Sequence, residues 1–597
     1  MCGIVGIVSS ENVSQKIFES LERLEYRGYD SAGIAVVNGE LQRRRAQGKL
    51  ANLKKELKKS PIAGNAGIGH TRWATHGLPI TENAHPHSTA KVSVVHNGII
   101  ENFLELRKEL EKAGYKFTSQ TDTEVIPILI TYYLDNGESD FKAFQKTISR
   151  LHGAFAIGAI FNGNDNLLMA AKRGSPLAIG YGDDEMFMAS DAIALAPLSQ
   201  KICYLEDDDI AKITSTSCEV FGKDGKSAER EVKISNISGA AVGKGNYRHF
   251  MLKEIHEQPI AIAQTLNAYY DPFNAKINLP KAKFDLRDIR KITIVACGTS
   301  YYAGMVAKYW IEQIAHIPVE VDVASEYRYR KPVYQKGGMF LAISQSGETA
   351  DTLAAIKHAK AAGQYIASIV NVPQSSIARE SDLIIPTLAG PEIGVASTKA
   401  FTCQLTALAA LAIALTPSVP GLLPQLADVP SLLTDILHID AYEDLADEMS
   451  LAKTVLYIGR GTSYPIAMEG ALKLKEISYI HAEGFGAGEL KHGPIALIDE
   501  SVPVVVIAPY DEYFAKTASN VREVAARGGK VILISNSKGC KELKDVTYKC
   551  IKMPFVPSFV APILYAIPAQ LLAYHIAVKK GTDVDQPRNL AKSVTVE

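Results

Sequence analysis

The most reactive pair of groups stands at the start of the chain, where Met1 is followed by Cys2 in MCGIVGIV. Met before a small residue is normally removed, so we expect Cys2 to carry a free α-amino group beside its thiol. Only the thiolate is nucleophilic, and a free cysteine has a pKa of about 8.5. An α-amino group, with a pKa of about 8, can accept that proton. Cys2 is therefore a candidate nucleophile that supplies its own base; the alternative is a small buried residue in a first strand.

A second set of chemistry-bearing residues lies in SQSGETADT (344–352), directly after the apolar run GMFLAI. Ser344, Ser346 and Thr349 surround a glycine just before a predicted helix. Hydroxyls, bare backbone N–H groups and a helix N-terminus together favour an anion. The alternative is a helix start that its own Ser and Thr side chains cap. A second loop, CGTS (297–300), also ends a predicted parallel strand, and such loops converge at the carboxyl edge of an open α/β sheet.

The length, net charge and cysteine spacing of the chain exclude several classes of protein. The chain has 597 residues, too many for one core, and a formal net charge of -1. Bulk charge therefore gives no reason to expect nucleic acid or an anionic membrane as a partner. The seven cysteines show no C-x-x-C pair and no zinc spacing. With no recognisable signal peptide, we expect reduced thiols and a cytoplasmic location. Prolines interrupt the apolar stretch Pro554–Val578, which we interpret as a buried helix rather than a membrane span.

The chain changes pattern near residue 240. Up to there, short Val-, Ile- and Ala-rich strands with Gly breaks surround two helical periods, Ser14–Leu24 and Asn102–Ala113. This predicts an α+β unit with sheet on sheet and helices outside. From about 285, apolar strands alternate with helices, which predicts parallel sheets covered on both faces. The expected organisation is a first domain at 1–240, a linker and entry helix at 241–284, α/β domains at 285–440 and 450–580, and a tail at 581–597.

The two α/β domains are copies of one another. ITIVACGTSYYAG (292–304) aligns with VLYIGRGTSYPIA (455–467) at an offset of 163 positions. The second copy keeps the GTS sequence. Where the first copy has SQSGET, however, the second has IAPYDE, which is apolar and acidic. An acidic side chain would repel phosphate, so we predict one phosphate site per chain, in the first copy.

The first 240 residues resemble the glutaminase domain of the N-terminal-nucleophile amidotransferases. The resemblance rests on CGIVGI, LEYRGYDSAGIA, GHTRWATHG, NAHPH, HNGIIEN and TDTE, in that order. It implies that Cys2 attacks the side-chain amide of glutamine. It further implies an oxyanion hole of Asn97 and the Gly98 N–H, Arg72 on the α-carboxylate, Asp122 on the α-ammonium, and Thr75 and His76 in the pocket wall. His85 and His87 lack the further ligands of a metal site, so we expect them at the pocket rim.

The repeated half resembles the sugar isomerase domains that bind phosphosugars, and the whole chain resembles the bacterial glutamine–fructose-6-phosphate aminotransferase family. This implies that Glu476 moves the proton between C1 and C2, with Lys473 one turn earlier. It implies that His492, from a partner subunit, assists ring opening and that Lys592 forms a Schiff base with the ketose. The remaining implied sugar-phosphate contacts are Thr299, Ser300, Ser344, Gln345, Ser346, Thr349, Val395, Ser397 and Arg588. Taken alone, Lys473 and Glu476 could be a surface ion pair and the tail a frayed terminus.

The resemblance also implies how the two halves cooperate. Ammonia released at Cys2 would pass internally to the sugar, with Trp73 and Ala591 along the channel. The products would be glucosamine 6-phosphate and glutamate, the first step of hexosamine synthesis. We expect no metal or other cofactor, no nucleic acid and no membrane partner, and a homodimer through the isomerase domains.

Two alternatives stay open at this point. A different amidotransferase could share the Cys2 domain, but a phosphoribosyl transferase would need an acidic diphosphate-sugar loop that is not seen. A non-catalytic phosphosugar sensor could share the isomerase domain, but it would need a DNA-binding unit. The sequence shows no helix-turn-helix signal and no basic patch.

Overall fold

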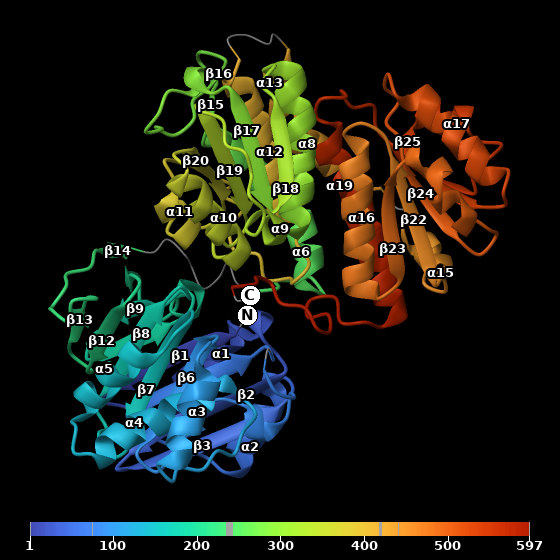
Figure 1. Ribbon diagram of the computed structural model, residues 1–597. Helices are drawn as coiled ribbons and strands as arrows, with labels where there is room; N and C mark the ends of the chain where they lie inside the picture. Colours follow the sequence, from blue (N-terminus) through green and yellow to red (C-terminus); the bar gives the residue numbers. More distant parts are fainter. Residues whose placement is uncertain (1, 75, 235–242, 417–420, 440, 596–597) are drawn as a thin grey trace. The chain divides into compact units, whose positions relative to one another are not determined.

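The computed structural model describes residues 2–74, 76–234, 243–416, 421–439 and 441–595. The chain forms two compact units (Figure 1). The first comprises Met1–Gly243 together with Ala591–Glu597, and the second comprises Lys244–Leu590. Thr75 is therefore the one predicted site residue outside the described ranges.

The first unit contains two antiparallel sheets packed face to face. Their strand orders are β14-β11-β9-β10-β1-β4-β2-β3 and β13-β12-β8-β7-β6-β5. The strands are β1 (Gly3–Ser9), β2 (Ser31–Asn38), β3 (Glu40–Gln47), β4 (Ala66–Arg72), β5 (His87–Ser88), β6 (Val92–Gly98), β7 (Phe155–Phe161), β8 (Leu168–Arg173), β9 (Ala178–Tyr181), β10 (Glu185–Ala189), β11 (Lys201–Tyr204), β12 (Asp209–Ile213), β13 (Cys218–Phe221) and β14 (Val232–Ile234).

Helices cover the outer faces of this sandwich. They are α1 (Ser14–Glu22), α2 (Leu50–Lys59), α3 (Phe103–Lys112), α4 (Val125–Asp135) and α5 (Asp140–Arg150). One core lies between the sheets and includes Ile4, Ile68 and Ile160; a second lies beneath α3, α4 and α5. The predicted α+β sandwich is confirmed. The sequence pattern gave no clear signal for α4, because its first seven residues are all buried and it lacks a polar face.

The second unit holds two five-stranded parallel sheets with the same topology, β18-β17-β19-β20-β21 and β23-β22-β24-β25-β26. The predicted internal repeat is therefore confirmed. The strands are β17 (Lys291–Ala296), β18 (Val319–Val323), β19 (Gly338–Ser344), β20 (Tyr365–Val370), β21 (Leu383–Pro386), β22 (Thr454–Gly459), β23 (His481–Gly486), β24 (Pro503–Ile507), β25 (Lys530–Asn536) and β26 (Lys549–Met553). A short hairpin of β15 (Tyr270–Asp271) and β16 (Lys276–Ile277) precedes them.

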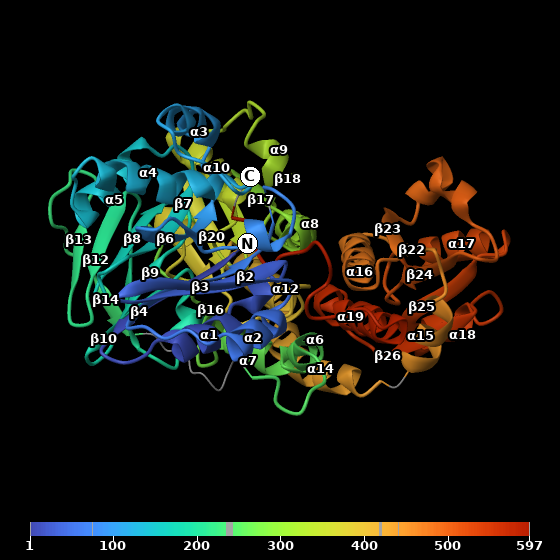
Figure 2. The same cartoon turned by 90° about the horizontal axis from the view of Figure 1, so that it is seen from below.

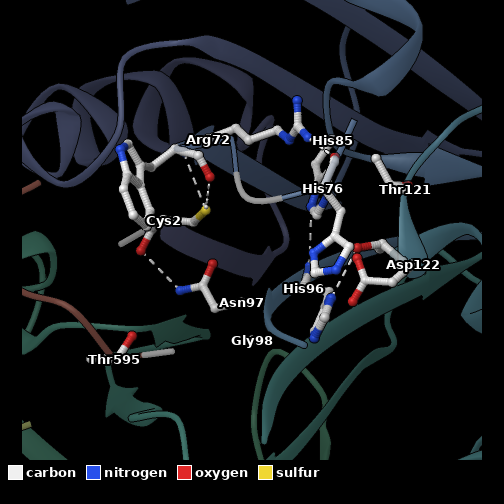
Figure 3. Close-up of a pocket in the computed structure, with 12 residues that line it drawn as sticks. Cys2, Arg72, His76, His85, His96, Asn97, Gly98, Thr121, Asp122 and Thr595 are labelled. Atoms are coloured by element: carbon white, nitrogen blue, oxygen red, sulfur yellow. Dashed lines mark hydrogen bonds between the residues drawn. The ribbon is translucent and has the colours of Figure 1, made fainter. Parts of the chain in front are cut away.

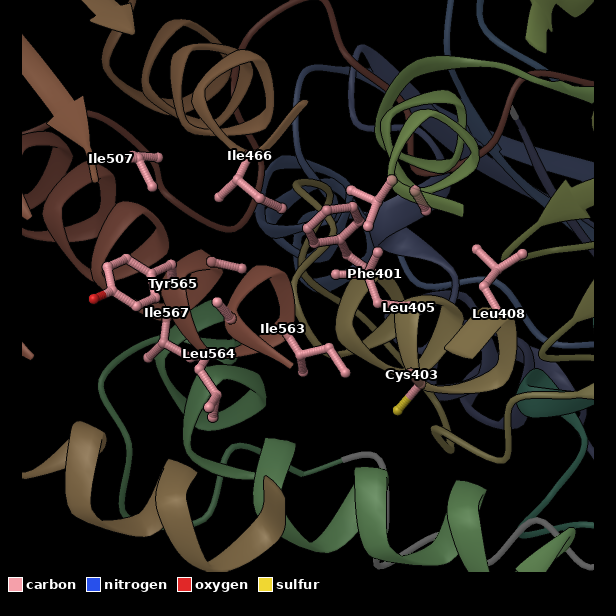
Figure 4. Packing of buried hydrophobic residues seen from close by; sticks show 14 of the residues in the cluster. Phe401, Cys403, Leu405, Leu408, Ile466, Ile507, Ile563, Leu564, Tyr565 and Ile567 are labelled. Atoms are coloured by element: carbon pink, nitrogen blue, oxygen red, sulfur yellow. The ribbon is translucent and has the colours of Figure 1, made fainter. Parts of the chain in front are cut away.

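Helices lie on both faces of each sheet, as Figures 1 and 2 show. The helices of the second unit are α6 (Phe250–His256), α7 (Gln258–Asn267), α8 (Gly298–Ile314), α9 (Ala324–Tyr327), α10 (Ala350–Ala361), α11 (Ser376–Glu380), α12 (Lys399–Ala414), α13 (Leu422–Ala427), α14 (Val429–Leu437), α15 (Glu443–Met449), α16 (Ser463–Ser478), α17 (Phe514–Ala525), α18 (Ser537–Glu542) and α19 (Ala561–Lys580). One core runs through both copies, and in Figure 4 Phe401 and Leu405 of α12 lie near Ile563 of α19.

Helix α19 is the one helix in the described ranges that is long and apolar enough to cross a membrane. Its apolar window is 89% buried inside the protein, which agrees with the predicted buried helix. Pro562 stands in its first turn, where a missing N–H is tolerated, and Pro568 lies inside it.

The expectation that all thiols are reduced is wrong for one pair. Cys540 of α18 and Cys550 of β26 form a disulfide, because α18 follows β25, the strand next to β26, and brings the two Cα atoms to 6.1 Å. The other five cysteines, Cys2 included, are free.

Candidate active site

The predicted glutamine-site residues meet in one pocket of the first unit. Strand β1 pairs antiparallel with β4, with Gly3 opposite Thr71, so Cys2 comes to lie beside the end of β4. Strand β6 ends in Asn97 and Gly98 on the other sheet. The pocket is lined by Cys2, Arg72, Trp73, His76, His85, His96, Asn97, Gly98, Thr121, Asp122, Thr123 and Thr595 (Figure 3).

The Cys2 thiol is held by backbone groups. Its Sγ lies 3.3 Å from the Trp73 nitrogen, which donates to it, and 3.4 Å from the Trp73 carbonyl oxygen. Burial raises the pKa of the thiol, while the Trp73 N–H and the positive charge of Arg72 act in the opposite direction. The thiol therefore needs a base to become a nucleophile at neutral pH.

Two potential oxyanion donors follow one another at the end of β6. The Asn97 side chain is buried, and its Nδ2 donates to the Cys2 carbonyl oxygen at 2.9 Å. Gly98 has a φ of +126°, and a Cβ there would lie 2.0 Å from the Ala154 carbonyl oxygen. Only glycine fits this turn. The close approach of Ala154, the residue before β7, thus fixes the backbone beside Asn97.

One cation and one anion lie in the same pocket. The Arg72 guanidinium donates to the carbonyl oxygens of His76, Gly77 and Leu78, and burial lowers its pKa. The carboxylate of Asp122 accepts a hydrogen bond from the Ile100 N–H at 2.8 Å. A fixed positive and a fixed negative group are what an amino acid zwitterion requires.

Several lining residues were not identified as site residues from sequence. His96, Thr121 and Thr123 lie inside or beside the quoted motifs, so the motifs could have indicated them. Thr595 could not be found this way, because only the fold returns the C-terminal residues to the first unit. His85 lines the pocket and stacks on His70 with ring centroids 4.1 Å apart.

His85 and His87 are both buried, and their rings meet edge to face. Within the described ranges, no group of three or more His, Cys, Asp or Glu side chains is arranged to hold a metal. The half-buried indole of Trp73 lines the pocket, while Ala591 and Lys592 are half-buried in the tail segment of the first unit. The channel and Schiff-base roles stay predictions.

In the second unit, the hydroxyl-rich loop follows β19 as predicted. The Gly347 N–H donates to Ser344 Oγ at 3.0 Å, and Ser344 Oγ lies 3.0 Å from Thr349 Oγ1. Thr349 is the N-cap of α10, yet its hydroxyl does not cap that helix. Ser346 Oγ accepts from the Glu348 N–H. Ser300, which the structure places in the first turn of α8 rather than in a loop, accepts a hydrogen bond from Gln404 at its Oγ. The capping alternative therefore does not account for Thr349.

A buried charge cluster joins the two isomerase copies. Lys473 Nζ lies 2.6 Å from Glu476 Oε2, 3.4 Å from Glu469 Oε1 and 3.1 Å from Thr299 Oγ1. The Lys473 side chain is only 1% exposed, so this is not a surface ion pair. Burial alone would lower its pKa, but the two carboxylates outweigh burial and raise it. Burial raises the pKa of Glu469 to about 7. Sequence reasoning missed Glu469, although it stands one helical turn before Lys473.

The other predicted sugar-site residues take varied positions. Ser397 Oγ donates to Glu392 at 2.9 Å, and the Val395 N–H donates to the Asp585 carbonyl oxygen at 3.1 Å. The Arg588 guanidinium lies over the Tyr479 ring, 4.3 Å from its centroid. The Gln345 carbonyl oxygen accepts from the Asn371 N–H. His492 is exposed in the short helix Glu489–His492.

Comparison with known proteins finds a matching family in each of the two compact units. A family model described as a SIS domain matches residues 285–414 and 448–580, and a glutamine amidotransferase domain matches residues 70–197. A solved C-terminal domain of glucosamine-fructose-6-phosphate aminotransferase from Francisella tularensis is 46% identical, with a TM-score of 0.53. It covers 58% of this chain and 100% of its own.

Full-length relatives are closer in sequence. The protein of Zymomonas mobilis subsp. mobilis named glutamine–fructose-6-phosphate aminotransferase (isomerizing) is 58% identical over 100% of both chains. A protein of the same name from Brucella abortus biovar 1 is 54% identical, again over 100% of both. The chain therefore belongs to the glutamine–fructose-6-phosphate aminotransferase (isomerizing) family.

Proposed function

We propose that the pocket around Cys2 carries out the glutaminase half of the family's reaction, and that the two isomerase copies together with the C-terminal tail carry out the sugar half. The chain converts fructose 6-phosphate and glutamine to glucosamine 6-phosphate and glutamate. The observation that carries the proposal is the convergence of Cys2, Asn97, Arg72 and Asp122 on one pocket. A nucleophile, an oxyanion donor and a pair of opposite charges are what glutamine hydrolysis requires.

In the glutaminase half, Cys2 attacks the amide carbon of glutamine, and its α-amino group, freed when Met1 is removed, carries the proton to the leaving ammonia. The Asn97 amide and the Gly98 N–H stabilise the oxyanion of the tetrahedral intermediate. Arg72 binds the α-carboxylate and Asp122 the α-ammonium. Thr75 and His76 complete the wall. The burial of the thiol supports this scheme, because a thiol with a raised pKa depends on a base held next to it.

In the sugar half, the phosphate binds between the 297–300 and 344–349 loops, with Thr299, Ser300, Ser344, Gln345, Ser346 and Thr349 as its contacts. Val395 and Ser397 contact the sugar, and Arg588 orients the tail. Lys592 forms the Schiff base with the ketose carbonyl, and Glu476 moves the proton between C1 and C2. The buried ion pair with Lys473 supports the role of Glu476, because it holds the carboxylate in one place.

Transfer of ammonia and assembly complete the proposal. Ammonia passes along a channel at Trp73 and Ala591, which keeps it from water. The chain acts as a homodimer in which His492 of one copy assists ring opening in the other; the exposure of His492 within its own chain supports this arrangement. The partners are thus glutamine, fructose 6-phosphate and a second copy, without nucleic acid or membrane. The proposed location is the cytoplasm.

The domain division proposed for the chain is 1–240, 241–284, 285–440, 450–580 and 581–597.

The test of function compares the wild type with Cys2→Ala and, as a matched control, with Cys218→Ala, another half-buried free cysteine. Glutamate and glucosamine 6-phosphate are measured from the same reaction. We expect Cys2→Ala to make neither product from glutamine and Cys218→Ala to make both. Release of glutamate by Cys2→Ala at the wild-type rate would refute the proposal.

A further inference from the structure

The buried histidine next to the oxyanion donor has no role in the scheme above. His70 lies in β4, is 0% exposed and does not line the pocket. Its Nε2 is 3.1 Å from Asn97 Oδ1 and 3.1 Å from the His96 carbonyl oxygen. It therefore contacts the proposed oxyanion residue without lining the pocket itself.

The partners of His70 define its protonation. Both groups facing Nε2 are oxygen acceptors, so Nε2 must carry the hydrogen. Nδ1 is buried and has no partner in the described ranges, which suits a bare lone pair and would leave a proton there unsatisfied. Burial lowers the pKa of His70 to about 3, so the ring is neutral at physiological pH. His70 is a fixed, uncharged donor.

That donor determines which way the Asn97 amide points. Oδ1 faces the His70 N–H, while Nδ2 donates to the Cys2 carbonyl oxygen at 2.9 Å. Rotation of the amide by 180° would set nitrogen against the N–H of His70 and oxygen against the carbonyl of Cys2. Both hydrogen bonds would be lost and replaced by repulsive pairs. An amide nitrogen has two hydrogens, so one remains for an oxyanion.

We propose that His70 is a positioning residue for glutamine hydrolysis: its Nε2–H holds the Asn97 amide with the nitrogen toward Cys2, so that the oxyanion donor is oriented before glutamine arrives. The inference rests on the proposed role of Asn97 in the glutaminase half. Removing one oxyanion donor costs about 10²- to 10³-fold in kcat. Loss of its orientation alone is therefore expected to cost about 10- to 100-fold.

Three single variants of the full-length protein, and the double variant that combines His70→Phe with Asn97→Ala, test this. His70→Phe keeps a ring that can stack on His85 but removes the donor. His70→Gln restores an N–H at similar reach. Asn97→Ala removes the residue through which His70 is proposed to act. For each, kcat and KM of glutamine hydrolysis are measured, together with the rate of Cys2 alkylation by iodoacetamide and ammonia-dependent formation of glucosamine 6-phosphate.

We expect His70→Phe to lower kcat about 10- to 100-fold, with KM changed less than about threefold and alkylation unchanged. His70→Gln should recover most of the loss. In the Asn97→Ala background, His70→Phe should have no further effect, because the two residues act as one unit. Unchanged ammonia-dependent synthesis shows that each variant folds.

Three results would overturn the inference. They are a wild-type kcat in His70→Phe, an equal loss of kcat in the Asn97→Ala background, and an Asn97→Ala variant with wild-type kcat. The first two results leave the proposed function intact, whereas the third would also remove Asn97 from the proposed oxyanion hole. The role of Cys2 as nucleophile is tested separately by Cys2→Ala. If Cys2→Ala still hydrolyses glutamine, the proposed function itself fails.

Discussion

The two isomerase copies have the same strand order but different side chains at matching positions. On helix α8 of the first copy, the positions that match Glu469, Lys473 and Glu476 are Val306, Trp310 and Gln313. Val306 and Trp310 are buried, and Trp310 packs in the core with its Nε1 donating to the Phe559 carbonyl oxygen. The three charged residues of the α16 cluster thus have no charged counterpart at the matching positions of α8.

The residues that follow β17 in the first copy and β22 in the second copy also differ in how closely other side chains approach them. Gly298 and Gly461 both have positive φ, 54° and 57°. A Cβ on Gly298 would meet nothing within 4 Å, whereas one on Gly461 would lie 2.9 Å from the Tyr513 ring. The space beside Gly298 is therefore open, whereas an aromatic side chain fills the equivalent place in the second copy. The shared topology supplies equivalent positions, and under the proposed function their side chains assign phosphate binding to the first copy and proton transfer to the second.

The largest effect is expected from removing the proposed base of the second copy, Glu476. Glu476→Gln should lower formation of glucosamine 6-phosphate about 10³-fold, because proton transfer by a positioned carboxylate contributes about 10² to 10⁴. Glutamate release should persist. The control is Gln313→Ala, the matching exposed position of the first copy, which should retain activity. Equal losses in the two variants would contradict the division of roles.

A smaller effect is expected from adding charge to the loops. Ser346→Asp should raise KM for fructose 6-phosphate about 100-fold, because a carboxylate beside a phosphate costs about 2–3 kcal/mol. Tyr510→Asp adds the same charge to the exposed loop of the second copy and should leave KM unchanged. Steady-state kinetics at saturating glutamine measures both. If Tyr510→Asp also raises KM, the second copy takes part in phosphate binding.

The smallest effect concerns stability and pH. Glu469 has a pKa of about 7 in the folded protein, raised from 4.5 by burial, so the folded state binds its proton more tightly than the unfolded state. The contribution of Glu469 to the free energy of unfolding is fully present below pH 4.5 and is lost as pH rises through about 7. Between pH 5 and 7.5, the free energy of unfolding of the wild type should therefore fall by about 2 kcal/mol more than that of Glu469→Gln. Urea unfolding of both proteins at the two pH values measures it, and identical pH slopes would refute the assignment.

Motifs located most of the residues that line the pocket of the first unit. Cys2 was a candidate from its place next to Met1, whereas Arg72, Asn97 and Asp122 were implied by the resemblance that the motifs carry. The structure brings all four to one pocket. Motifs succeeded there because each residue stands beside or within a short local element: Cys2 precedes β1, Arg72 ends β4, Asn97 lies near the end of β6 and Asp122 begins the short helix Asp122–Glu124. They failed for Thr595, which reaches the pocket from the far end of the chain, and for the buried α4, whose apolar surface has no period.

The amino-acid sequence by itself determined the order of the domains, the repeat and the residue types that can react, because these depend on spacing along the chain. Only the tertiary structure decided the environment of each group. Burial between two carboxylates makes Lys473 part of an internal cluster rather than a surface pair, and it raises the pKa of Glu469. The orientation of the Asn97 amide likewise depends on His70, 27 positions away. Desolvation and hydrogen bonding are properties of neighbours in space, and spacing along the chain does not reveal them.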